Sequence, residues 1–301
     1  MKLTMNNNKI LENFLEKNVL VTGGAGFVGS HLIETIFPYA KKIISIDNYL
    51  TGKIENHISG VDYIDASVID VFDKLKNNDF DYIFHFGEYS RVERSLEEPD
   101  IAIKNITQPL PTLLKFWNEK NAKFIYSGSS TKFAENGKGK NLSPYTLAKA
   151  HNTELVKCYG EWNNLDFSIV YFYNVYGGRE IKYGKYSTLI AKYQRLIEED
   201  STSLPVSLPG TQLRNFTYID DIVSGILLAS MHGSGDNFGI GADESHSVLE
   251  VVEMFNCKPN LFETNSANRK TGELKTNKIK DLGWTQQMTL KKYVKDWLAK
   301  R

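Results

Sequence analysis

Short apolar runs alternate with helical stretches over the first 173 residues of the chain. Predominantly apolar runs lie at 19–21, 42–46, 61–64, 82–86, 123–126 and 167–171. Residues 27–37 follow the first run and have helical spacing of their apolar positions. Strands in a parallel sheet are apolar along their length, because helices cover both faces of the sheet. The pattern therefore predicts an α/β fold with a doubly wound parallel sheet.

The pattern becomes less regular after residue 173. Helical spacing is found at 187–199, 220–231, 248–255 and 289–300. We expect a dinucleotide-binding domain over residues 1–173 and a smaller α/β lobe, partly interleaved with it, over residues 174–301. Apolar residues scattered between Ile10 and Leu15 predict a short amphipathic helix that packs ahead of the first strand.

Composition excludes several classes of protein without identifying a ligand. The chain has 301 residues and a formal net charge of +0, so it has no general attraction to nucleic acid or to anionic membranes. Cys158 and Cys257 lack the spacing of metal ligands and suit a reducing compartment. No apolar run approaches the ~20 residues that cross a bilayer, and no signal-peptide core precedes the first strand. We expect a cytoplasmic protein without a metal, a nucleic-acid partner or a membrane partner.

A glycine-rich turn follows the first apolar run and leads into a helical stretch. It has the sequence TGGAGFVG at residues 22–29, with Gly23, Gly26 and Gly29 at its bends. Glycine lets the backbone turn tightly and approach a pyrophosphate, and the helix that follows presents unpaired N–H groups to the phosphates. In this strand–turn–helix setting the turn predicts a dinucleotide site.

Asp47 ends the second apolar run, 18 residues after Gly29. A carboxylate there accepts hydrogen bonds from the ribose hydroxyls of adenosine and repels a 2′-phosphate. No arginine directly follows Asp47, although Lys53 is nearby. The alternative is an aspartate that caps the next turn. The pattern favours NAD over NADP.

Tyr145 and Lys149 are spaced to lie on one face of a helix that begins at Pro144. A free tyrosine has a pKa near 10 and is a poor base at neutral pH. A lysine ammonium and an oxidised nicotinamide ring would each stabilise the phenolate. Such a pair is usually a surface feature, but behind a dinucleotide site it predicts a catalytic base and its partner.

At this point the chain resembles the extended short-chain dehydrogenase/reductase family, in its NAD-dependent nucleotide-sugar epimerase/dehydratase branch. The motifs that carry the resemblance are TGGAGFVG at 22–29, IDNYLTG at 46–52, HFGEYSRVERS at 85–95, SGSS at 127–130, YTLAK at 145–149, FYNVYG at 172–177 and RNFTYIDDI at 214–222. The resemblance implies a Rossmann fold, NAD as cofactor and a nucleotide-diphosphate sugar as substrate. A homodimer is the expected assembly.

The resemblance also implies roles for single residues. Ser129 would be the third catalytic residue, beside Tyr145 and Lys149. Asn105 matches a family asparagine, with helix packing as the alternative role. The cofactor would be held by Gly23, Gly26, Phe27, Val28, Gly29, Asp47, Asn48, Ser67, Val68, Phe86, Tyr145 and Lys149. Ser67 stands where family members often have an adenine-contacting aspartate, for which Asp65 is the alternative.

On the substrate side the match is uneven. The implied contacts are Glu88, Ser90, Arg91, Asn174, Arg214 and Lys270. Arg214 matches an arginine that neutralises the pyrophosphate. Lys270 replaces a phosphate-binding arginine, unless a shift of one residue puts Arg269 there. Gly87-Glu88 replaces the small-residue pair that is usual in the family, and it brings a carboxylate near the nicotinamide side.

Residues next to Ser129 limit the reaction. The family's 4,6-dehydratases have an Asp-Glu pair where this chain has Ser130 and Thr131, and hydroxyls are poor acids and bases at neutral pH. The glutamate of the decarboxylases is missing too, and Cys158 does not complete the Cys/His pair of the reducing epimerases. Hydride transfer at C4 of the sugar remains.

Two net reactions use that chemistry, and the sequence does not separate them. A 4-dehydrogenase or ketoreductase, acting on a GDP-heptose or similar sugar, is slightly favoured by the unusual Gly87-Glu88 and Ser90-Arg91. A 4-epimerase of the UDP-hexose type is the alternative. Lys-, Asn- and Ile-rich composition suggests a bacterium and surface-polysaccharide synthesis. A non-catalytic NAD-binding protein is a remote third reading, since such relatives usually lose the Tyr/Lys pair.

Overall fold

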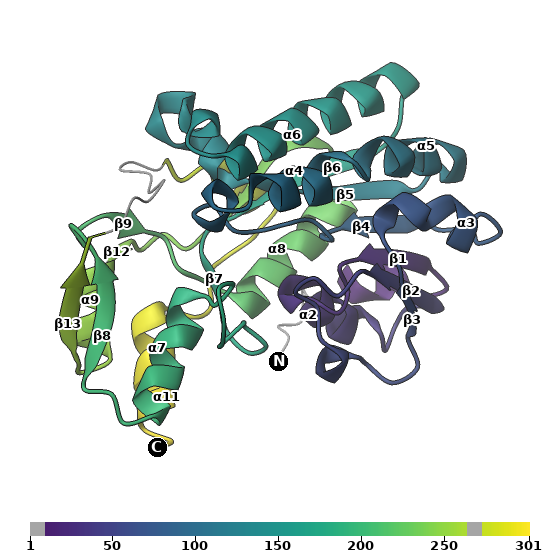
Figure 1. The fold of residues 1–301 in the computed structure, drawn as a ribbon. Helices are drawn as coiled ribbons and strands as arrows, with labels where there is room; N and C mark the ends of the chain where they lie inside the picture. Colours follow the sequence, from purple (N-terminus) through teal and green to yellow (C-terminus); the bar gives the residue numbers. More distant parts are fainter. Residues whose placement is uncertain (1–9, 264–272) are drawn as a thin grey trace.

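Seven parallel strands form one sheet in the part of the chain that the computed structural model describes, residues 10–263 and 273–301 (Figure 1). In spatial order they are β11 (Gly235–Ile240), β6 (Phe167–Phe172), β5 (Lys123–Ser129), β4 (Tyr82–His85), β1 (Asn18–Thr22), β2 (Lys42–Asp47) and β3 (Asp62–Asp65). The central strands are buried along their length, which explains the unbroken apolar runs. The predicted fold class is confirmed.

Helices cover both faces of this sheet, as Figure 1 shows. One face carries α3 (Val71–Leu75), α4 (Pro99–Thr107), α5 (Leu110–Lys120) and α6 (Pro144–Asn163). The other carries α2 (Phe27–Ile36), α8 (Ile219–His232) and α10 (Asn277–Asp281). Each layer closes over its own apolar cluster, so the sheet is removed from water on both sides. None of the helices among the described residues has the length and apolar character that a bilayer crossing requires.

Helix α6 begins at a fixed position because its first turn is capped. The Ser143 hydroxyl accepts from the Thr146 N–H, and the Thr146 hydroxyl accepts from the Ser143 N–H. Pro144 occupies the first helical position, as predicted. The helix ends where Asn164 takes the left-handed conformation. Both Tyr145 and Lys149 therefore lie in the capped, well-defined half of the helix.

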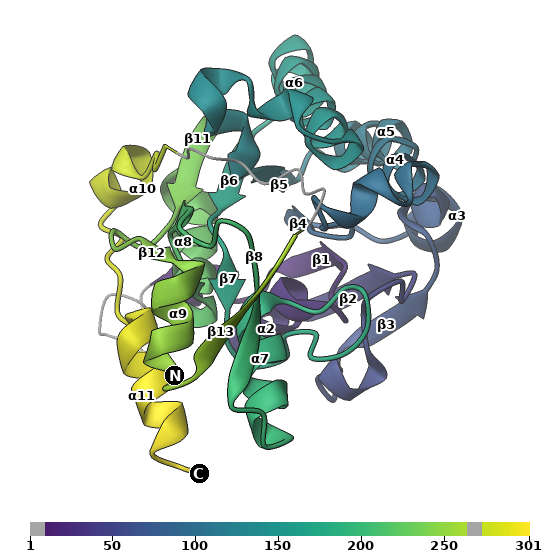
Figure 2. The same cartoon turned by 60° about the vertical axis from the view of Figure 1, so that its left-hand side comes forward.

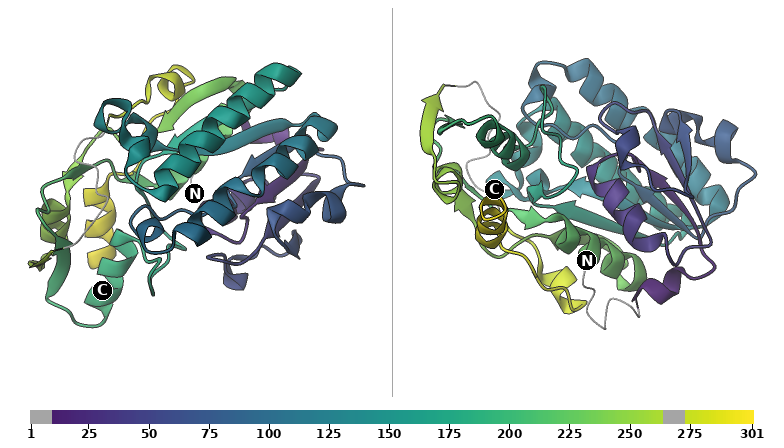
Figure 3. Two further views of the ribbon diagram at one scale, coloured as in Figure 1. Left: turned by 45° about the horizontal axis from the view of Figure 1, so that its top comes forward. Right: turned by 90° about the horizontal axis from the view of Figure 1, so that it is seen from below.

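A smaller lobe is built on a pair of parallel strands, β8 (Ser203–Ser207) and β13 (Lys258–Phe262), which lie side by side in Figure 2. Helices α7 (Leu189–Glu198), α9 (Val248–Met254) and α11 (Leu290–Leu298) share an apolar core with them. The two views of Figure 3 show this lobe at one end of the sheet. These three helices and α8 agree with the four predicted after residue 173.

Residues after 173 also contribute to the sheet. Strand β11 was not predicted, yet it pairs with β6 as the seventh strand, and α8 packs on the sheet. The end of the sheet therefore does not coincide with residue 173. The sequence GDNFGI of β11 has no apolar run, because the strand lies at the sheet edge with only its second half buried.

Shorter elements complete the fold. Two-residue strands pair as β7 (Val175–Tyr176) with β10 (Thr217–Tyr218) and as β9 (Leu213–Arg214) with β12 (His246–Ser247). Single 3-10 turns lie at η1 (Glu12–Phe14), η2 (Ile54–Asn56), η3 (Val68–Asp70), η4 (Arg94–Leu96), η5 (Ser130–Phe133), η6 (Glu135–Gly137) and η7 (Gly139–Asn141). The segment ahead of β1 packs as predicted, with Ile10, Leu11 and Phe14 buried in the core.

Candidate active site

A cavity of about 680 Å³ opens at the carboxyl ends of the central strands. It is lined from the sheet side by residues that follow β1, β2, β4 and β5, and from the lobe side by residues of α7 and β9. The strand order reverses between β1 and β4, the place where doubly wound folds bind their ligands. The cavity thus joins the two parts of the molecule.

The glycine turn forms one wall of this cavity. Gly23 has a φ of +74°, and a Cβ there would lie 2.7 Å from the Gly87 Cα. A Cβ at Gly29 would lie 2.3 Å from the Gly23 carbonyl oxygen. Gly26 caps α2, whose first residues, Phe27 and Val28, also line the cavity. The first-turn N–H groups of α2 therefore stand where a pyrophosphate would be held.

Asp47 is tied to the same turn. Its carboxylate accepts from the N–H groups of Ala25 at 3.0 Å and Tyr49 at 2.9 Å. Burial raises the pKa of Asp47, against the opposing effect of these two hydrogen bonds. Asn48 lines the cavity next to it and donates to the Asn105 amide oxygen at 3.1 Å.

The remaining predicted cofactor residues lie close by. Phe86 lines the main cavity. Ser67 and Val68 line a second, small cavity of about 20 Å³, which Asp47, Asn48 and Asn105 share. Asn105 also donates to the Ile101 carbonyl one turn earlier in α4, and it lines both cavities. Asp65 lines neither cavity.

Tyr145, Lys149 and Ser129 all line the main cavity. The Ser129 hydroxyl is 2.8 Å from the Thr131 hydroxyl. Lys149 is 3% exposed and donates to the Ser127 carbonyl on β5. Three residues from two elements thus line one cavity, and their catalytic roles stay predictions.

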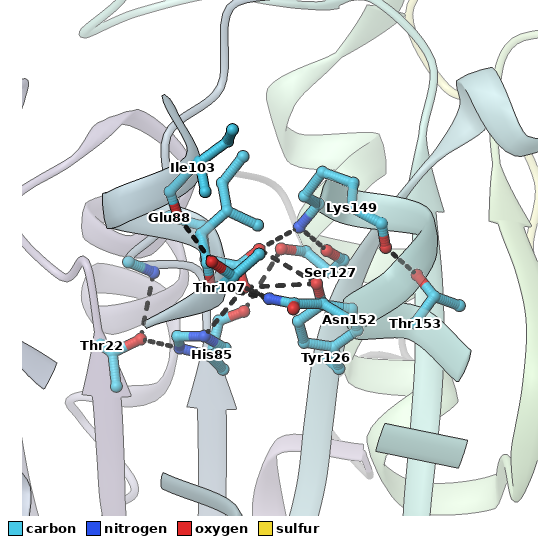
Figure 4. Close-up of polar contacts among 12 residues, drawn as sticks. Thr22, His85, Glu88, Ile103, Thr107, Tyr126, Ser127, Lys149, Asn152 and Thr153 are labelled. Carbon is cyan, nitrogen blue, oxygen red and sulfur yellow. Dashed lines mark hydrogen bonds and ion pairs between the residues drawn. The ribbon is translucent and has the colours of Figure 1, made fainter. Parts of the chain in front are cut away.

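Glu88 forms a buried ion pair with Lys149 (Figure 4). The side chains of both residues are 4% exposed. Asn152 donates to Glu88 Oε1 at 2.9 Å, and the Tyr126 hydroxyl lies 3.1 Å from Oε2. Burial acts to raise the pKa of the Glu88 carboxyl. Lys149 and His85 act in the opposite direction and prevail, so the pKa is lowered to about 2. Glu88 lines the cavity as expected, and its oxygens accept from Lys149, Asn152 and Tyr126, while its contact with the substrate stays a prediction.

The other predicted substrate residues within the described chain line the same cavity. Ser90, Arg91, Asn174 and Arg214 line the cavity. Arg91 donates through Nε and Nη2 to the Tyr186 carbonyl at 2.9 and 2.6 Å, and it forms no ion pair within the described residues. Asn174 donates to the Asn215 carbonyl at 3.2 Å. Lys270 and its alternative, Arg269, lie outside the described residues.

The sequence analysis missed several cavity residues, among them Lys192 and Glu180, whose pKa values are shifted. Lys192 of α7 has no side-chain hydrogen bond or ion pair in the described chain, and burial, Arg195 and Arg94 lower its pKa. Glu180 is 6% exposed and accepts from the Gly177 N–H at 2.8 Å, and burial raises its pKa to about 7. Neither position belongs to a pattern that a single sequence reveals, because both reach the cavity through the folding of the lobe.

The model of the NAD dependent epimerase/dehydratase family matches residues 19–241. The chain belongs to this family. It is 26% identical over 297 residues to a protein of Methanocaldococcus jannaschii named "Putative UDP-glucose 4-epimerase", with 92% of this chain and 96% of that protein covered. It is 28% identical over 261 residues to a UDP-N-acetyl-alpha-D-glucosaminuronate decarboxylase of Bacillus cytotoxicus, with 79% of each covered. The Thermotoga maritima UDP-glucose 4-epimerase, solved with UDP-glucose, superimposes with a TM-score of 0.85 at 25% identity, covering 94% of this chain and 99% of that one.

Family membership confirms the resemblance and the cofactor. The family acts with NAD, and the residues present fit this cofactor. The glycine turn lies too close to Gly87 for a side chain at Gly23, and Asp47 ends the next strand. The family consists of enzymes of the nucleotide-sugar epimerase and dehydratase type. The homodimer, the cytoplasmic location and the link to surface polysaccharides stay predictions.

Proposed function

We propose that the protein oxidises C4 of the sugar in a nucleotide-diphosphate sugar, and that the net reaction is 4-epimerisation of a UDP-hexose. The observation that carries the proposal is one cavity lined by both the dinucleotide turn and the group of Tyr145, Lys149 and Ser129. An enzyme that transfers hydride between cofactor and sugar needs both at one place.

The side chains have distinct tasks in this scheme. Tyr145 accepts the proton of the C4 hydroxyl, and Ser129 donates a hydrogen bond to the same oxygen. The ammonium of Lys149 lies one turn along the helix and favours the phenolate form of Tyr145. When bound, NAD supplies the hydride acceptor and later returns the hydride. For epimerisation the cavity must also let the keto sugar turn before the hydride returns.

Cations in the cavity support a diphosphate substrate. Arg91, Lys192 and Arg214 line it, and neither Arg91 nor Lys192 has a carboxylate partner among the described residues. A guanidinium suits the paired oxygens of a phosphate, and an unpaired ammonium gains a counter-ion from it. These groups would meet the pyrophosphate while the sugar reaches toward Tyr145.

Epimerisation is placed first because relatives matched over nearly their whole length carry that name, including the M. jannaschii and T. maritima proteins. A 4-dehydrogenase or ketoreductase, on a GDP-heptose or similar sugar of bacterial surface-polysaccharide synthesis, is the second candidate. Glu88 and Arg91, two charged residues that line the cavity, favour it. Glu88 lies beside Lys149, and Arg91 has no acidic partner among the described residues. The intact Tyr145–Lys149 pair argues against a non-catalytic protein.

The test is a panel of UDP-hexoses and GDP-heptoses incubated with the purified protein and NAD, followed by mass spectrometry and NMR. An unchanged mass with inverted C4 indicates the epimerase, and a loss of two hydrogens indicates the dehydrogenase. Tyr145→Phe should slow either reaction by ~10²–10⁴ while NAD still binds. Tyr159→Phe, on the same helix outside the cavity, is the matched control. Absence of turnover with every sugar, or full activity of Tyr145→Phe, would contradict the proposal.

A further inference from the structure

A half-buried cluster and a buried cluster in the described part of the chain have the same composition, a carboxylate, a lysine and a tyrosine. In one, Asp236 contacts Lys132 at 2.6 Å and the Tyr171 hydroxyl at 2.6 Å. Those three residues line neither cavity. In the other, Glu88 contacts Lys149 and Tyr126 next to the catalytic group. The same chemistry is structural in the first position and lies beside the catalytic base in the second.

We propose that Glu88 is a positioning residue that anchors Lys149 and sets the pH at which Tyr145 acts as a base. The inference rests on the proposed function for its catalytic meaning. It departs from the sequence expectation, in which Glu88 contacted the substrate.

The first support is geometric, since every group around Glu88 is itself held (Figure 4). Lys149 is fixed between Glu88 and the Ser127 carbonyl, with its Nζ 4.6 Å from the centre of the Tyr126 ring. Asn152 donates to both Glu88 and the Ile106 carbonyl, which links α6 to α4. The ammonium therefore has one position before any ligand arrives.

The network extends to the cofactor turn. Glu88 Oε1 lies 3.3 Å from His85 Nε2, and His85 Nδ1 lies 2.6 Å from the Thr22 hydroxyl. That hydroxyl also accepts from the Gly87 N–H at 3.0 Å, which ties the network to the residue next to Glu88. Nε2 is the ring nitrogen of His85 that faces Glu88. Although that contact falls short of hydrogen-bond geometry, it orients the carboxylate from the side of β4.

The second support is electrostatic. An ion pair has no net charge, so Glu88 offsets much of the effect that the Lys149 ammonium has on Tyr145. The ionisable groups facing this region are His85 from β4, Tyr126 from β5, Arg91 from the loop after β4, and Tyr145 and Lys149 from α6. Among them Glu88 opposes formation of the phenolate, and Arg91 and Lys149 favour it.

Removing the carboxylate should therefore make Tyr145 ionise at lower pH. The test titrates phenolate absorbance with NAD bound and no sugar present, as the difference between each protein and its Tyr145→Phe counterpart. In Glu88→Gln the Tyr145 phenolate should form about one pH unit lower than in the unmodified protein. Glu88→Ala, which carries a small residue usual in the family at this position, should shift it in the same direction. Glu88→Asp keeps the charge and should leave the pH nearly unchanged.

The control is Asp236→Asn, which removes a carboxylate from the matching cluster outside the cavity. It should leave unchanged the pH at which the Tyr145 phenolate forms. With a turned-over sugar, the pH profile of kcat/KM should move with the phenolate. An unshifted phenolate in both Glu88→Gln and Glu88→Ala would overturn the inference, as would an equal shift in Asp236→Asn. Because the titration uses no sugar, it decides the role of Glu88 even if the substrate panel fails.

Discussion

At the scale of single residues, Asp47 connects the backbone of the glycine turn to the proposed dinucleotide site. Its carboxylate holds the Ala25 N–H of the glycine turn and also lies at the edge of the cavity. Gly52 passes close to the same group, since a Cβ there would lie 2.9 Å from both carboxylate oxygens. The carboxylate is thus fixed from two sides before a ribose arrives, which limits the entropy lost on binding.

We expect Asp47→Asn to weaken NAD binding by about tenfold, or ~1.4 kcal/mol, and to narrow the preference for NAD over NADP. The amide keeps one acceptor, but it no longer repels a 2′-phosphate. Titration calorimetry with both dinucleotides measures the effect. Asp65→Asn, at the end of the neighbouring strand β3, serves as the control. Equal NAD affinity and an unchanged ratio in Asp47→Asn would refute the assignment.

Glu180 makes stability depend on pH, because burial raises its pKa from 4.5 to about 7. An acid with a higher pKa in the folded state stabilises the fold while it is protonated. Its contribution is fully present below pH 4.5 and is lost as the pH rises through about 7. Relative to the unmodified protein, Glu180→Gln should therefore gain up to about 3 kcal/mol of unfolding free energy between acidic and mildly basic pH.

Urea denaturation of both proteins at about pH 4 and about pH 8 would test this dependence. Glu253→Gln, an exposed glutamate of α9, should show no comparable change and serves as the control. A Glu180→Gln stability difference that is the same at both pH values would show that Glu180 is not held in its protonated form.

At the level of elements, the start of α6 determines where the proposed catalytic residues stand. The capping box of Ser143 and Thr146 encloses Tyr145, and the Tyr145 N–H also donates to the Ser95 hydroxyl at 3.2 Å. Four residues later Lys149 meets the end of β5. A helix that frayed at its first turn would release the base before it released the lysine.

Ser143→Ala should lower the unfolding free energy by about 1 kcal/mol and also reduce kcat. The matched control is Thr289→Ala, which removes the side-chain cap of α11, remote from the cavity. Both variants should lose similar stability in urea denaturation. If kcat fell in both variants, or in neither, the cap of α6 would not be what positions Tyr145.

On the scale of the whole molecule, the cavity joins the glycine turn on the sheet to residues of the lobe. The reactions that this site can carry out depend on which acidic side chains line the cavity. Ser130 and Thr131 line it where dehydratases of the family have acidic residues, Glu88 is paired with Lys149, and Glu135 does not line it. Glu180 lines it too, and burial raises its pKa to about 7, so that part of it is protonated near neutral pH.

We therefore expect no loss of water from the sugar after oxidation at C4. Elimination needs a base at C5 and an acid at C6, and hydroxyl side chains provide neither at neutral pH. Product masses from the nucleotide-sugar panel decide the question. A product lighter by one water would contradict the expectation and would make Glu180→Gln the next variant to test.

Much of this architecture follows from the sequence alone. Strands β1 to β6, the glycine turn, Asp47 and the Tyr145–Lys149 pair were all predicted. Each depends on residues near one another in the chain, so apolar runs, turn chemistry and helical spacing are sufficient to reveal them.

Other features were decided by the tertiary structure. Glu88 and Lys149 are 61 residues apart, and nothing in either segment shows that the two charges meet. Strand β11 has no apolar run, and it is a strand because β6 offers it an open edge. Lys192 and Glu180 acquire their altered pKa values from burial against other elements. Local patterns record which side chains are present, whereas burial and charge pairing arise when distant segments pack together.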